Sequence, residues 1–70
     1  MDINFTKHAE HRVKQRGITK EDVVEAILNP TFTFIKHGKL YYQRKTSTGT
    51  IEVICEKEGN NLKIITLYWI

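Results

Sequence analysis

The chain has 70 residues, which leaves room for two layers of structure around one core, so we expect residues 1–70 to form a single domain. Hydrophobic residues make up 40% of the chain and charged residues 27%, a balance typical of folded rather than disordered proteins. The net charge of +3 is unevenly distributed, and the presence of one cysteine, Cys55, excludes a disulfide within the chain.

Residues 6–16 are predicted to form a short helix. The hydroxyl of Thr6 can cap the first turn, and Gly17 can adopt the left-handed conformation that closes many helices. Only Ala9 and Val13 are clear positions for a buried face, and so short and polar a helix is not stable alone. We therefore expect it to pack against the rest of the domain with its cationic side exposed.

A second helix is predicted to begin after Thr19, a good N-cap residue, and to end at Asn29-Pro30, because proline disfavours a helical residue before it. Acidic residues at 21 and 22 fall in the first turn, where the helix dipole favours negative charge, so helix chemistry explains them. The expected apolar face consists of Val23, Val24, Ile27 and Leu28.

After Pro30 the pattern changes from helical to alternating, which indicates strands joined by short turns. The expected strands are residues 31–36, 40–45, 51–56 and 62–70. Successive hairpins predict an α+β fold in which two N-terminal helices pack on a four-stranded antiparallel sheet, in the order α-α-β-β-β-β. The last strand is nearly all apolar, so we expect it to be central or covered on both sides.

The compartment is predicted from what the sequence lacks. No apolar run follows the initial methionine, so we expect no signal peptide. No segment approaches the roughly 20 apolar residues of a spanning helix, so we expect no membrane partner. With only one cysteine, the chain is predicted to be a soluble cytoplasmic protein.

Residues with the chemistry to handle a phosphodiester gather on the first predicted helix. Helical spacing places His8, Arg12 and Arg16 in one stripe. An imidazole can accept or donate a proton near neutral pH, and guanidinium groups can hold phosphate oxygens through paired donors. These are the components of metal-independent RNA cleavage, which needs a base, an acid and cations around the phosphate.

The N-terminal segment and the last strand also resemble a known family. The pattern is Phe5-Thr6-x-His8-Ala9-x-x-Arg12-x-x-x-Arg16-Gly17-Ile18, followed by Glu21-Asp22-Val23, Asn29-Pro30 and Ile64-Ile65-Thr66-Leu67-Tyr68. It resembles the DUF4258 family of small domains over almost the whole chain. This resemblance implies a fold similar to RelE-type and related bacterial RNase toxins. The candidate catalytic positions that it carries over are His8, Arg12, Arg16, Thr66 and Tyr68.

A second basic segment, residues 36–45, contains four basic residues and no acidic ones, which fits an electrostatic surface for a polyanion. Tyr41 shares a strand face with Lys39 and Lys45 and can stack on bases. The candidate RNA-binding residues are Lys39, Tyr41, Arg44 and Lys45. No metal or other cofactor is expected, because His8 and His11 lack an evident third ligand and no phosphate-binding glycine loop occurs.

Three functions remain open from the sequence. The first is an endoribonuclease toxin that binds RNA and pairs with an acidic antitoxin protein. The second is a non-catalytic module that binds nucleic acid or protein through the same basic surface. The third is a structural protein whose cationic helix docks an acidic partner.

Overall fold

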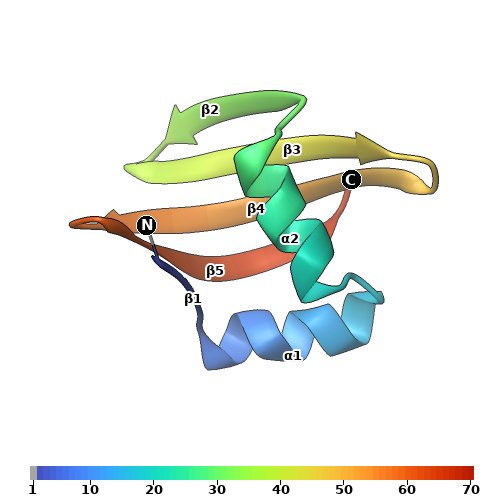
Figure 1. The fold of residues 1–70 in the computed structure, drawn as a ribbon, viewed down its shortest axis with the longest axis horizontal. Coiled ribbons are helices and arrows are strands. Elements are labelled where there is room, and N and C mark those ends of the chain that lie inside the picture. Colours follow the sequence, from blue (N-terminus) through green and yellow to red (C-terminus); the bar gives the residue numbers. More distant parts are fainter. Residues whose placement is uncertain (1) are drawn as a thin grey trace.

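A computed structural model describes residues 2–70 of the chain. The elements along the chain are β1 (Asp2–Phe5), α1 (Lys7–Arg16), α2 (Lys20–Leu28), β2 (Phe32–Lys36), β3 (Lys39–Thr46), β4 (Gly49–Glu58) and β5 (Asn61–Trp69). The strands form one mixed sheet in the order β1-β5-β4-β3-β2, with only β1 and β5 parallel (Figure 1). The predicted α+β class, with two N-terminal helices packed on the sheet, is confirmed. The sheet is mixed and has five strands, whereas a four-stranded antiparallel sheet was predicted. Neither helix of residues 2–70 has the length and apolar character needed to cross a membrane.

Both helices begin and end where the sequence predicts. Thr6 caps α1 by accepting a hydrogen bond from the Ala9 N–H, and Gly17 closes the helix at φ 65°. At the start of α2, Thr19 and Asp22 form a capping box in which each side chain accepts from the other's backbone N–H. The ends of both helices are therefore determined by local chemistry.

The first strand, β1, was not predicted. It is four residues long and pairs with residues 61–64 of β5, far away along the chain. Ile3 and Phe5 pack against the core from this strand. The pairing gives β5 a neighbour on each side, so the prediction that the last strand is central is confirmed.

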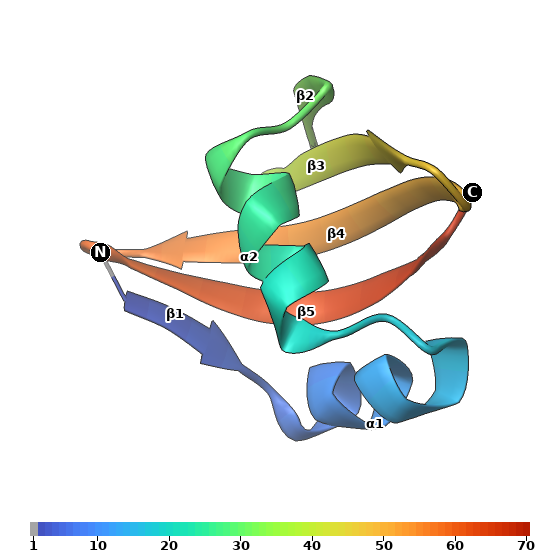
Figure 2. The ribbon, with the colours of Figure 1, turned by 45° about the vertical axis from the view of Figure 1, so that its right-hand side comes forward.

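The core lies between α2 and one face of the sheet, here called the covered face. Its buried sheet residues include Val53, Cys55 and Leu67, all 0% exposed. Figure 2 shows α2 lying over the sheet, where it packs on β4 and β3, with α1 beside β5. The apolar face of α2 differs from the prediction at one end, because Ala26 is buried while Leu28 is 59% exposed.

A β-bulge explains the nearly continuous apolar sequence of β5. Ile54 pairs with Thr66 and Cys55 pairs with Ile64, so Ile65 has no partner on β4. The extra residue reverses the alternation of the strand. Ile64 and Leu67 consequently both point to the covered face, and Thr66 points to the opposite one, here called the uncovered face.

Candidate nucleic-acid interface

Helix α1 is fixed along β5 at both ends. At its start, the Thr6 hydroxyl donates to the carbonyl of Ile64 at 2.8 Å, and at its end the carbonyl of Arg16 accepts from Trp69 Nε1 at 2.8 Å. The ten residues of the helix span about 15 Å, and the strand from Ile64 to Trp69 spans about 17 Å, so the two run side by side in the same direction. On this scale Thr66 lies level with the middle of α1.

Two of the predicted catalytic residues touch each other on α1. Arg12 Nε donates to His8 Nε2 at 3.3 Å, and another nitrogen of Arg12 donates to Gln15 Oε1 at 2.8 Å. In this arrangement Nε2 of His8 carries a lone pair and is the basic nitrogen of the ring. Arg16 lies one turn further on with an exposed side chain. The predicted stripe therefore exists, with a direct contact at its N-terminal end.

The orientation of α1 turns this stripe toward the uncovered face. Glu10 accepts from Lys20 of α2 at 2.6 Å, and that hydrogen bond lowers the pKa of Glu10. Because α2 lies over the covered face, Glu10 marks the flank of α1 on that side. His8 and Arg12 are each two positions away, about 200° around the helix, and so lie on the opposite flank.

The other two predicted catalytic residues, Thr66 and Tyr68, lie on the uncovered face of β5. The hydroxyl of Tyr68 donates a short hydrogen bond to Glu52, whose other carboxylate oxygen accepts from Gln43 Nε2 at 2.6 Å. Burial, reinforced by the hydrogen bond to Glu52, raises the pKa of Tyr68 to about 12. Within residues 2–70, no hydrogen bond or ion pair joins Thr66 or Tyr68 to the α1 stripe.

The predicted RNA-binding residues divide between the two faces. Lys39, Tyr41 and Lys45 lie on the uncovered face, because alternate strand residues share a face. Arg44 belongs to the covered face, where it donates to the carbonyl of Asn29 at the end of α2 and lies 3.8 Å from Glu25. This position explains Arg44 as a cation at a helix C-terminus. Only the other three residues can act together.

The uncovered face is ordered in rows that cross the strands. Cross-strand pairing defines an aromatic row, Phe34, Tyr41, Ile54 and Thr66, and beside it a polar row, Phe32, Gln43, Glu52 and Tyr68. A lysine row, Lys36, Lys39, Glu56 and Lys63, follows on the other side of the aromatic row. Phe34, Gln43 and Glu52 are not among the predicted site residues, although the alternation in β2, β3 and β4 places them on one face.

Glu52 is unusual on this face because it is only 7% exposed. A buried carboxylate needs donors to replace water, and Gln43 and Tyr68 supply them. Residues 2–70 contain no group of three or more His, Cys, Asp or Glu side chains placed to hold a metal ion.

The fold and this surface define a small α+β domain in which a cationic helix borders an uncovered sheet face. The chain belongs to the DUF4258 family, because the model of that domain of unknown function matches residues 5–69. Comparison with curated proteins gave no match, and comparison with solved structures gave none either.

Proposed function

We propose that the protein is a metal-independent endoribonuclease that binds RNA along the uncovered face and cleaves it beside α1. The observation that supports this most directly is the hydrogen bond from Arg12 Nε to His8 Nε2 at 3.3 Å. It joins a basic nitrogen to a guanidinium on an exposed surface. Arg12 retains further N–H donors that can engage phosphate oxygens.

The proposed reaction uses the 2′-hydroxyl of the RNA as the nucleophile. When Arg12 turns its Nε–H from His8 to the phosphate, the lone pair of His8 Nε2 is freed and takes the proton of the 2′-hydroxyl. The 2′ oxygen then bonds to phosphorus, and the bond from phosphorus to the 5′ oxygen breaks. Arg12 and Arg16 stabilise the charge on the non-bridging oxygens. Tyr68 can supply the proton that the 5′ oxygen takes up if its hydroxyl turns from Glu52 to that oxygen, because a hydroxyl with a pKa of about 12 is protonated at neutral pH. Thr66 adds a hydroxyl donor to the phosphate.

The test is incubation of the purified protein with RNA in the presence of a metal chelator. His8→Ala should lower the cleavage rate by about 10²-fold or more, which is the usual contribution of a general base. The matched control is His11→Ala, because His11 is also exposed on α1 but makes no side-chain hydrogen bond to Arg12, whose partners are His8 and Gln15. If His8→Ala cleaves as fast as the parent protein, the catalytic role of His8 is wrong.

Binding is measured separately with a 2′-O-methyl RNA strand, which lacks the nucleophile. His8→Ala should retain affinity within a few-fold, while Arg12→Ala and Arg16→Ala should weaken both binding and cleavage. Each arginine variant should also flatten the dependence of log affinity on log salt by about 0.7, the value for one phosphate of a single strand. A flat salt response of the parent protein would contradict an electrostatic RNA-binding surface, for the nuclease and for a binding module alike.

A non-catalytic RNA-binding module is the second candidate. The observation in its favour is that α1 presents one imidazole to Arg12, while the hydroxyl of Tyr68 is already engaged by Glu52. A second group free to transfer protons is therefore not assembled around His8. Salt-dependent RNA binding without any cleavage would favour this candidate over the nuclease.

The proposed physiological role is that of a toxin held in check by an acidic antitoxin protein that covers the α1 stripe. This role predicts that expression of the protein slows growth and that His8→Ala relieves the effect. A neighbouring gene for a small acidic, helix-rich protein should also relieve it when both are expressed. Growth unaffected by the parent protein would contradict the toxin role, whatever the outcome of the cleavage assay.

A further inference from the structure

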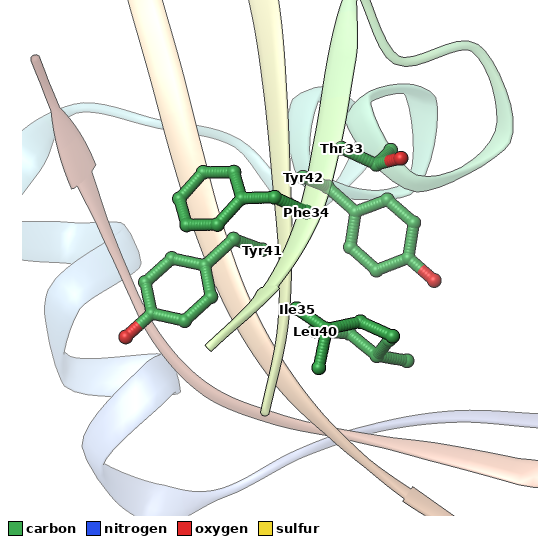
Figure 3. Close-up of a pocket in the computed structure, with 6 residues that line it drawn as sticks. All are labelled: Thr33, Phe34, Ile35, Leu40, Tyr41 and Tyr42. Carbon is green, nitrogen blue, oxygen red and sulfur yellow. The ribbon is translucent and has the colours of Figure 1, made fainter. Parts of the chain in front are cut away.

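Three aromatic rings lie next to one another on the uncovered side of the β2–β3 hairpin. Phe34 and Tyr41 are stacked, with ring centroids 4.6 Å apart and planes 16° apart, and Phe32 lies 5.7 Å from Phe34. Figure 3 shows Phe34 and Tyr41 projecting together from one side of the hairpin, whereas Tyr42 and Ile35 project from the other. The residues that line this hollow therefore come from both sides of an edge hairpin, and they do not enclose a cavity.

These rings are not explained by the core. The core lies on the covered face, and the aromatic row lies on the opposite one. Phe32 is 58% exposed, and Phe34 belongs to the edge strand, so no further strand covers its outer side. Flat apolar surfaces of this kind can stack with nucleobases of any sequence.

Positive charge follows the aromatic row along one side. The lysine row contains Lys36, Lys39 and Lys63 with one acid, Glu56, which lies 3.6 Å from Lys39 and 3.5 Å from Lys63. Glu58, next to the row, lies 3.6 Å from Lys63. Lys36 has no acidic partner within ion-pair distance among residues 2–70. Lys45, which lies on the far side of the polar row, has none there either. An extended polyanion lying across the strands would find rings beneath its bases and lysines beneath its phosphates.

The aromatic row also leads to the proposed cleavage site. From Phe34 on β2 it crosses three strand spacings, about 14 Å, and ends at Thr66 on β5. Thr66 lies level with the middle of α1, on the side of the sheet toward which His8 and Arg12 turn. A strand bound along this row would therefore bring one of its phosphates to α1.

We propose that the aromatic row is a binding platform for single-stranded RNA, with bases stacked on Phe34 and Tyr41 and phosphates held by the lysine row. This inference deepens the proposed function, on whose RNA substrate it rests. A duplex does not fit the platform, because its bases are already stacked within the helix and cannot lie on the rings. The substrate class that fits the platform is therefore unpaired RNA.

The test measures binding of a labelled 2′-O-methyl single strand, a duplex of the same length, and an abasic strand with the same backbone. Phe34→Leu and Tyr41→Leu keep an apolar side chain but remove the ring, and each should weaken single-strand binding by about 5- to 150-fold. Ile35→Ala is the matched control, since Ile35 is 72% exposed on the same strand but points to the opposite face.

The parent protein should bind the single strand more tightly than the duplex or the abasic strand. Equal binding of the abasic strand, or unchanged binding by both leucine variants, would overturn the platform. A parent protein that cleaves RNA while the leucine variants bind normally would leave the nuclease standing without the platform. Ring-dependent binding without cleavage would support the platform and contradict the nuclease. Self-association that depends on Phe34, without any RNA binding, would show that the row is a protein interface.

Discussion

Replacing Tyr68 by phenylalanine should destabilise the protein by removing one donor from a buried carboxylate. The Tyr68 hydroxyl donates to Glu52, which is 7% exposed and keeps only Gln43 as a partner in the variant. Hydrogen bonds to charged groups contribute about 1.5–3 kcal/mol. Tyr68 is itself partly exposed, so solvent screens the interaction, and we expect a loss of about 1–2 kcal/mol at neutral pH.

The same substitution should change the dependence of stability on alkaline pH. Burial raises the pKa of Tyr68 from 10.0 to about 12, so protonated Tyr68 contributes stability that is fully present below pH 10. That contribution is lost as the pH rises through about 12. At 1.36 kcal/mol for each pKa unit it amounts to at most about 2.7 kcal/mol, and solvent screening reduces it. Because phenylalanine cannot ionise, the difference between parent and variant should narrow as the pH rises above 10.

Urea denaturation followed by circular dichroism, from pH 7 upward to pH 11, measures both effects. At pH 7, Tyr41→Phe is the control for loss of a tyrosine hydroxyl, because Tyr41 lies on the same face but its hydroxyl makes no hydrogen bond within residues 2–70. Ionisation of Cys55, another alkaline group, contributes equally to parent and variant and cancels in the difference. Equal stability of Tyr68→Phe and the parent at pH 7 would refute a stabilising hydrogen bond from Tyr68 to Glu52. So would a stability difference that stays constant with pH.

Two further predictions concern the core. Ile27→Ala should lower the free energy of unfolding by about 2–5 kcal/mol, because Ile27 is 6% exposed. Leu28 is 59% exposed, so Leu28→Ala should change that free energy by no more than about 0.5 kcal/mol. Equal urea midpoints for the two variants would contradict the orientation of α2. Burial raises the pKa of the Cys55 thiol to about 12, so an alkylating reagent should label it at the rate of unfolding, and rapid labelling of the native protein at pH 8 would show that this part of the core is open.

The helices were predictable because their ends depend on neighbours in sequence. Thr6, Gly17 and Thr19 act through contacts within a few residues, and a sequence pattern contains all of that information. The strand β1 depends instead on pairing with β5 at the other end of the chain. Four residues show too little alternation to indicate such a pairing. The exposure of Leu28 likewise depends on where α2 lies over the sheet.

The candidate site was predictable to a similar extent. Four-residue spacing predicted the contact between His8 and Arg12, and strand alternation predicted that Lys39 and Tyr41 share a face. The same alternation separates Arg44 from them, so its grouping with the other basic residues followed charge rather than geometry. The bulge at Ile65 changes which residues of β5 face outward, and the apolar run alone did not reveal it.

Glu52 is the residue for which stability provides the weakest explanation. Alternation places it on the uncovered face, where a glutamate is expected to be solvated, yet side chains of adjacent strands bury it. Replacing all partners of a buried hydrogen-bonded group by apolar groups of similar shape is often nearly neutral, so packed apolar side chains could take the place of Gln43, Glu52 and Tyr68 without loss of stability. Those side chains would lack a hydroxyl held in one orientation beside the aromatic row. We therefore infer that the polar row contributes to the proposed ligand-binding surface more than to the stability of the sheet.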